Sequence, residues 1–176
     1  MQETPQQYIE RMLTILGTQQ PLKVQSATPK KIERLLKGAP GSKLRKRPAP
    51  GKWSVGEILA HIADTELVLG YRVRAILGNP GTPIQGFDQD AWASAMRYDK
   101  RDPRKSFDRF CALRENNLAL LKTLAPEQWE QHGMHSERGK ETVAHVAKMT
   151  AGHDINHLGQ IERILASKPA KNKKKK

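Results

Sequence analysis

The chain has 176 residues, a single cysteine and a formal net charge of +13. One cysteine excludes an intramolecular disulfide, and with it the disulfide-rich secreted scaffolds, so a reducing, cytoplasmic location is expected. The length suits one domain with a core of its own. The N-terminal segment is typical of an amphipathic helix rather than a signal peptide, and the sequence contains no apolar run long enough to predict a membrane span.

The positive charge is concentrated in two segments. Residues 168–176 contain six lysines and residues 43–52 contain five basic residues, with no acid in either, which leaves +2 for the remainder. We therefore expect one domain over residues 1–167, followed by a disordered lysine-rich tail over 168–176. Such a tail aids solubility or binds polyanions weakly.

Helix signals dominate the chain, and strand signals are nearly absent. Thr4-Pro5 and Thr28-Pro29 each place a capping residue before a proline at the first helical position. Ser54-x-x-Glu57 is a capping box, and Asp102-Pro103 opens a further helix. The signals predict helices over 5–16, 29–37, 54–77, 103–124 and 141–166, loops over 39–52, 79–87 and 131–139, and a short helix over 88–97.

This order of elements predicts an all-α fold. We expect an antiparallel four-helix bundle with an extra N-terminal helix, and a long loop or short helix between bundle helices 2 and 3. The helix over 103–124 has one apolar face with the 3.6-residue period, on which Cys111 is expected to be a core residue. We expect the segment 79–98 to cover one end of the bundle near a site, or to contribute to a dimer contact.

Two histidines near the C-terminus have the spacing of metal ligands. His153 and His157 are four residues apart in a predicted helix, so their imidazoles lie one turn apart on one face. Alone, this spacing is common in histidines without a metal. His61 lies beside the apolar face of the helix over 54–77, where a histidine is either a core residue or a third ligand.

Two segments together resemble the DinB/YfiT-like superfamily of metal-dependent four-helix-bundle enzymes. The first is Trp-Ser, six intervening residues and then His, which is His61. The second is His-x-x-x-His-x-x-Gln-Ile, which begins at His153. The resemblance spans residues 29–166 and extends to Gly-Tyr-Arg at 70–72 and Gly-Phe-Asp at 86–88. It implies that His61, His153 and His157 bind one metal ion, in a family that includes thiol-dependent S-transferases and a mycothiol-dependent isomerase.

A site of three neutral imidazoles leaves a divalent ion with an open position for water or substrate. Zinc or nickel is the expected ion, with iron or copper as the alternatives. Asp64, one turn from His61, either orients a ligand or is an ordinary polar helix residue. Arg114 either holds an anionic group of the substrate or forms a buried ion pair with Asp64 or Glu57.

The remaining candidates have weaker signals. Arg72, on the His61 side of its helix, is a second candidate for holding a substrate anion. His145 is expected at the edge of the pocket. His132 and His135 fall in a predicted loop and are expected to be solvated.

The sequence therefore predicts a metal-dependent enzyme that activates water or a small thiol against a small-molecule substrate. Hydrolysis and thiol S-transfer are the two expected reaction types, with Arg114 and Asp64 as the candidate catalytic residues. The alternatives are a non-catalytic metal- or ligand-binding bundle and a nucleic-acid-associated protein that uses its basic tail. A homodimer and a low-molecular-weight thiol are the expected partners, with no membrane association.

Overall fold

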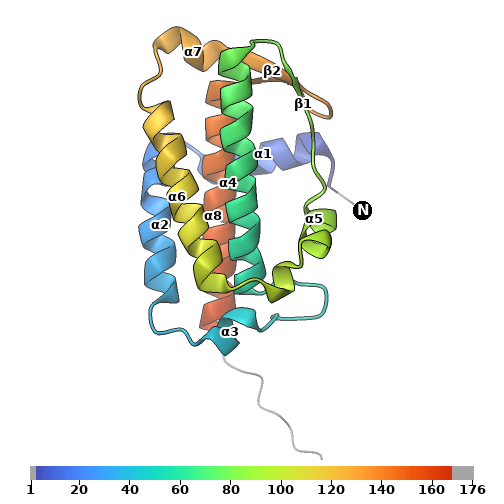
Figure 1. Cartoon of the computed structure of the whole chain (residues 1–176), viewed down its shortest axis with the longest axis vertical. Coiled ribbons are helices and arrows are strands. Elements are labelled where there is room, and N and C mark those ends of the chain that lie inside the picture. The colour runs from blue at the N-terminus through green and yellow to red at the C-terminus, as the bar shows by residue number, and fades with distance from the viewer. Residues whose placement is uncertain (1–2, 168–176) are drawn as a thin grey trace, which may run out of the picture.

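Four long helices form the body of the protein in a computed structural model that describes residues 3–167. They are α2 (Pro21–Leu36), α4 (Val55–Gly78), α6 (Pro103–Leu121) and α8 (Val143–Ala166). Around the bundle, α4 packs against α6 and α8, and α2 packs against the same two helices (Figure 1). The predicted four-helix bundle is confirmed.

The direction of the helices departs from a simple up-and-down order. In Figure 1 the chain descends in α2, ascends in α4 and again in α6, and descends in α8. The neighbours α4 and α8 are thus antiparallel, as expected, whereas α4 and α6 are parallel. The reason is the long segment between α4 and α6, which carries α5 (Gln89–Ala95) and the 3-10 helix η1 (Tyr98–Lys100) and returns the chain to the lower end.

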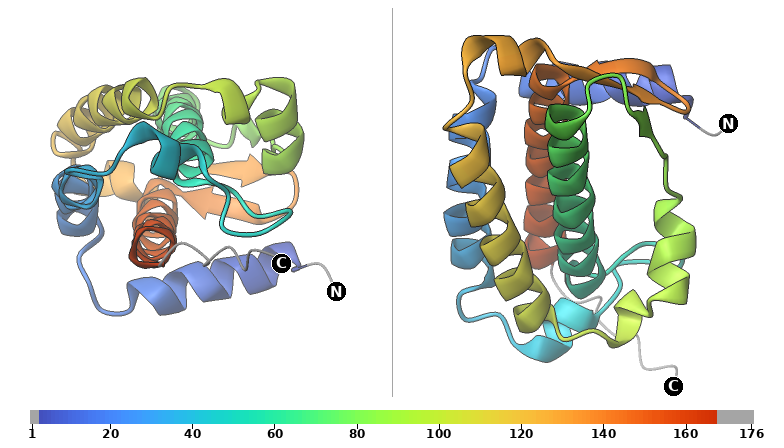
Figure 2. Two further views of the ribbon diagram at one scale, coloured as in Figure 1. Left: turned by 90° about the horizontal axis from the view of Figure 1, so that it is seen from below. Right: turned by 45° about the horizontal axis from the view of Figure 1, so that its top comes forward.

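The helix α1 (Pro5–Leu16) lies outside the bundle and crosses α8 (Figure 2). Its predicted cap is present, since Thr4 accepts a hydrogen bond from the backbone of Gln7, whose side chain in turn accepts one from the backbone of Thr4. Ser54 and Glu57 form the same reciprocal pair at the start of α4. Both helices therefore begin where their capping residues predict.

The predicted start of the second helix was wrong. The helix α2 begins at Pro21, and Pro29 lies inside it. A proline inside a helix donates no hydrogen bond to the carbonyl four residues earlier, which here belongs to Gln25. That carbonyl accepts a hydrogen bond of 2.9 Å from Nη1 of Arg114 instead, so a side chain from α6 replaces the missing bond.

A small sheet at the upper end of the bundle was not predicted from the sequence (Figure 1). Its strands are β1 (Pro83–Ile84), β2 (His132–His135) and β3 (Gly139–Thr142), with β1 parallel to β2 and β2 antiparallel to β3. Residues 131–139 were expected to be a polar loop, and α8 was expected to include residues 141 and 142. The strands have two to four residues each, too few for an alternating pattern to be recognised. A short helix α3 (Gly41–Arg45) and a short helix α7 (Pro126–Glu130) complete the fold.

Within the described residues, no helix is long and apolar enough to cross a membrane. The expected lysine-rich tail over 168–176 lies outside those residues. Among the described residues the hydrophobic core forms three clusters, and the largest lies between the four bundle helices at their lower half. Its fully buried side chains include Ile32, Leu36, Leu59, Phe110 and Ile161.

The contact between α1 and α8 depends on Gly152 of α8. A Cβ at Gly152 would overlap the backbone carbonyl of Met12, which cannot move without displacing α1. We expect Gly152→Ala to lower the free energy of unfolding by about 1–3 kcal/mol, measured by urea denaturation, because overpacking against backbone is strained. A Cβ at Gly159, on the same helix, would meet only the end of a flexible arginine side chain.

Gly159→Ala is therefore the matched control. It should be neutral or stabilising by up to about 1 kcal/mol, because alanine restricts the unfolded chain and favours helix. Equal stability of the two variants would show that α1 does not pack against α8 at Gly152.

Candidate metal centre

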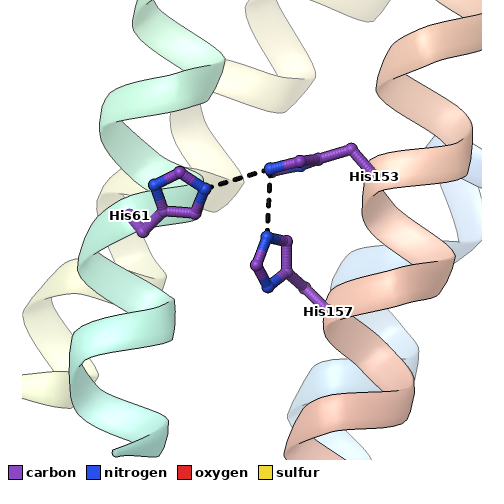
Figure 3. Close-up of side chains that lie close together, drawn as sticks. All are labelled: His61, His153 and His157. Carbon is purple, nitrogen blue, oxygen red and sulfur yellow. Dashed lines mark hydrogen bonds between the residues drawn. The ribbon is translucent and has the colours of Figure 1, made fainter. Parts of the chain in front are cut away.

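Helices α4 and α8 bring three imidazoles together, His61 from α4 and His153 and His157 from α8 (Figure 3). Nε2 of His153 lies 3.0 Å from Nε2 of His61 and 3.0 Å from Nε2 of His157. One ring nitrogen from each histidine lies within 4.8 Å of the other two. Two nitrogens bound to one divalent ion at about 2.0–2.1 Å lie about 3–3.4 Å apart for right-angled to tetrahedral geometry. Both 3.0 Å distances fall within this range.

The local sequence explains how the rings meet. The capping box at Ser54 fixes where α4 begins, which places His61 two turns into the helix. His153 and His157 lie one turn apart on the antiparallel helix α8, so both face α4. Trp53, just before the cap, packs against the His61 ring with centroids 4.9 Å apart. That contact holds the imidazole toward α8.

All three histidines are buried, and burial keeps them neutral. It lowers the pKa of His61 and of His153 well below the usual value, with repulsion from His157 as a further cause in both. Burial also lowers the pKa of His157 to about 4, although the hydrogen bond to Gln160 opposes the shift. Neutral imidazoles carry the lone pair that a metal ion needs.

The donor set fits a divalent ion. Nδ1 of His157 donates to Oε1 of Gln160 over 3.0 Å, which leaves the lone pair on Nε2, facing His153. Nε2 of His153 has two nitrogen neighbours at 3.0 Å, and one ring proton cannot serve both well. A cation between the three nitrogens satisfies all of them. Nδ1 of His61 is buried and has no partner among the described residues, so no hydrogen bond forces its Nε2 to carry the proton.

Gln160 is therefore predicted to tune the metal site from behind His157. Gln160→Leu removes the acceptor that fixes the ring tautomer, and we expect the affinity for a divalent ion to fall by about 10–100-fold. Gln160→Glu keeps an acceptor oxygen and should retain the affinity. Competition with a chelating dye measures both variants. Wild-type affinity in Gln160→Leu would contradict this role.

Two cavities reach the three histidines. A cleft of about 570 Å³ runs between α1, the end of α8 and the loop before α4, and His153 and His157 line it. A smaller cavity of about 160 Å³ is lined by His61 and His153. Tyr8 from α1 and Gln89 from α5 line both cavities. The sequence did not predict a role for either residue, because their position at the cavities depends on how α1 and α5 pack beside the bundle.

The structure gives Asp64 a different environment from the one expected. Its carboxylate accepts hydrogen bonds from the Tyr98 hydroxyl at 2.8 Å and from Nη1 of Arg101 at 3.0 and 3.1 Å. It does not line either cavity. These contacts assign Asp64 to holding η1 against α4, not to orienting a histidine or a substrate.

Arg114 is also directed away from the two cavities. Its side chain is 1% exposed, and it forms ion pairs with Asp154 at 2.6 Å and with Glu66 at 2.8 Å. The predicted partners, Asp64 and Glu57, were wrong, since Glu57 pairs with Arg47. The Gln25 carbonyl is a third acceptor, and only Nε of Arg114 is left without a partner among the described residues. Because the guanidinium is buried and lines neither cavity, it is closed to a substrate anion there.

The other histidines do not join the site. His135 was expected to be solvated, but it is buried in β2, where its Nδ1 accepts a hydrogen bond from the backbone of Glu137. His132, on the same strand, is half-buried. His145 lies 3.9 Å from Glu141 and lines neither cavity at the three histidines. Cys111 is a half-buried thiol packed against the core, and burial raises its pKa.

The sequence and the fold of this chain are similar to those of known proteins. The model of the DinB superfamily matches residues 26–161. A protein of Oceanobacillus iheyensis is 28% identical over 70% of this chain and 71% of its own length, and YfiT of Bacillus subtilis is 23% identical over 81% of each chain. Both carry the provisional name metal-dependent hydrolase. The solved structure of YfiT, described as having an unusual four-helix bundle topology, superposes with a TM-score of 0.72 at 24% identity, covering 81% of this chain and 84% of that one.

Proposed function

The chain belongs to the DinB superfamily, and on that premise we propose that it is a metal-dependent hydrolase of a small molecule. The proposal gives His61, His153 and His157 the role of ligands to one divalent ion. The observation that carries it is the approach of three neutral Nε2 atoms beside two cavities. The names of the relatives supply the reaction class.

The chemistry of the bound ion is that of a Lewis acid, which polarises a carbonyl or phosphoryl group and lowers the pKa of water or a thiol. The donor set consists of three imidazoles, which suits zinc, nickel, iron or copper, with zinc or nickel expected first. This donor set contains neither carboxylates nor thiolates, which disfavours magnesium, calcium and iron–sulfur clusters.

The residues of the chain bind and orient the substrate around this centre. The Tyr8 phenol lines both cavities, and burial raises its pKa, so at neutral pH it acts as a hydrogen-bond donor. The hydroxyl of Thr65 lies 3.5 Å from Nε2 of His61 on the wall of the smaller cavity. The carboxylates that line the larger cleft are Glu3 and Asp90, and Glu3 is paired with Arg11.

A thiol S-transferase is the second candidate, and the pair of cavities favours it. Both cavities are lined by His153, so a thiol in one cavity and an electrophile in the other would each have access to the histidines. A hydrolase needs room for only one organic substrate beside water.

The homodimer and the cytoplasmic location remain predictions from the sequence.

One experiment separates the two candidates. Purified protein is loaded with zinc, nickel, iron(II) or copper and incubated with panels of esters, amides and alkyl halides, with and without a small thiol. A hydrolase releases product without the thiol, whereas an S-transferase forms a thioether or thioester only with it. No turnover in any metal form, or equal turnover by His61→Ala, would contradict both.

A further inference from the structure

The wall of the smaller cavity contains a stripe of α4 that leads away from the histidines. His61, Thr65, Leu69 and Arg72 follow one another at spacings of four, four and three residues, and all four line the cavity. These spacings keep the side chains on one face of the helix. The cavity therefore has the metal ligand at one end of the stripe and a guanidinium at the other.

Arg72 is a buried cation without a carboxylate partner. It is 5% exposed, and within residues 3–167 it has no carboxylate within the 4.0 Å of an ion pair. Nη2 donates to the backbone carbonyl of Gln85 over 2.7 Å, which is its one protein hydrogen bond in that part of the chain. The guanidinium also lies over the Phe87 ring, 5.9 Å from the centroid.

The contrast with Arg114 shows how this protein treats a buried arginine elsewhere. Arg114 is compensated by two carboxylates, as a buried charge normally requires. Burial lowers the pKa of Arg72, and the charge of Arg138 lowers it further, while Glu141 and Glu137 oppose the shift from beyond ion-pair distance. The protein therefore leaves one guanidinium facing the cavity at a cost in free energy.

The remaining walls of the cavity suit an organic anion. Arg138 brings a second guanidinium, which is ion-paired with Glu141 behind it. None of the described residues that line the cavity carries a carboxylate, so no lining side chain among them repels an anion. Leu69 and Met149 supply apolar contact, and the volume of about 160 Å³ accommodates a molecule of only a few heavy atoms beyond the charged group.

We propose that this cavity binds a small organic anion, whose carboxylate or phosphate pairs with Arg72 while its apolar body lies against Leu69 and Met149. The opposite end of the molecule reaches the three histidines, so this inference rests on the proposed function and specifies its substrate class. A planar guanidinium with free donors pairs with carboxylate and phosphate oxygens in two-pronged fashion.

The test uses probes that report the metal and the anion site separately. Each probe is a hydroxamate, which chelates zinc, with a terminal carboxylate at the end of a methylene spacer; its partner has a carboxamide there instead. A series of spacer lengths is titrated calorimetrically into the zinc-loaded wild-type, Arg72→Gln, Arg72→Lys and Arg163→Gln proteins. Arg163→Gln is the matched control, because Arg163 is exposed and lines the larger cleft, so its variant removes one positive charge outside the proposed anion site.

The expected result is that, at one spacer length, wild type binds the carboxylate at least about tenfold more tightly than the carboxamide. Arg72→Gln should lose that preference and still bind the carboxamide as wild type does, which also shows that it is folded. Arg72→Lys should keep part of the preference, and Arg163→Gln all of it. Equal binding of the two probes by wild type, an unchanged preference in Arg72→Gln, or its loss in Arg163→Gln would overturn the proposal.

Inorganic phosphate is titrated into wild type and Arg72→Gln as a further arm. Phosphate binding tighter than that of the carboxylate, and lost in Arg72→Gln, identifies a phosphate ester as the substrate class. If no hydroxamate binds, the proposed metal site fails, and the phosphate titration alone tests the proposed anion site. Phosphate binding that is lost in Arg72→Gln would support the anion site. No phosphate binding, or equal binding by the two proteins, would contradict it.

Discussion

Replacing any one of His61, His153 and His157 by alanine is expected to abolish stoichiometric metal in the purified protein, and with it the proposed hydrolysis. The three Nε2 atoms converge on one point, so each variant leaves two ligands, and a pair binds far less tightly than the set. Loss of a hydrogen bond to a ligand alone costs about 10–100-fold in affinity, and loss of a ligand itself should exceed about 100-fold. Elemental analysis of untagged protein measures the metal content.

The helical fold should survive these substitutions, because the large core does not depend on the ion. The core cluster spans all four bundle helices, unlike the core of a zinc finger, which folds only with its metal. His132→Ala is the matched control, since His132 lies on β2 away from both cavities, and it should keep the metal. One equivalent of metal in purified His61→Ala or His153→Ala would contradict the three-histidine site.

Arg114→Met is expected to lower the free energy of unfolding by about 3–5 kcal/mol, the second large effect. The substitution leaves Asp154 and Glu66 buried without their cation, and the Gln25 carbonyl without its donor. Breaking one side of a buried ion pair costs this much because the remaining charge keeps its desolvation penalty. Arg109→Met, an exposed position on the same helix, should change stability by less than about 0.5 kcal/mol.

The pH dependence of the Arg114→Met effect has a definite sign. Burial already raises the pKa of Asp154 in wild type, against the pull of Arg114, and removal of the cation raises it further. An acid with a raised pKa in the folded state binds protons on folding, so stability is highest below its unfolded pKa and falls as pH rises. The difference between variant and wild type should therefore shrink from pH 7 toward pH 4. A constant difference, or one below about 1 kcal/mol at neutral pH, would show that Arg114 does not neutralise these carboxylates.

The sequence was informative where a signal is local. Capping fixes the starts of α1 and α4, and a four-residue spacing places His153 and His157 on one face, so these predictions needed no knowledge of the fold. That His61 meets them depends on the packing of α4 against α8, for which the sequence offered only the family resemblance.

The predictions failed where the decisive contact is distant in sequence. The face of α6 that carries Arg114 was predicted, but its partners come from α4 and α8, and periodicity cannot choose between the carboxylates on those helices. Pro29 looked like a helix start because the replacement donor for the Gln25 carbonyl lies 89 residues away along the chain. Arg72 was ranked below Arg114 for the same reason, since its lack of a carboxylate partner is visible only in the structure.

The proposed function requires that His61, His153 and His157 bind one divalent ion. Anomalous diffraction at the zinc absorption edge, from crystals of the zinc-loaded protein, tests it most directly. We expect one strong peak with Nε2 of all three imidazoles at about 2.0–2.1 Å. A peak bound elsewhere on the chain, or three imidazoles that turn away from zinc supplied in excess, would contradict it.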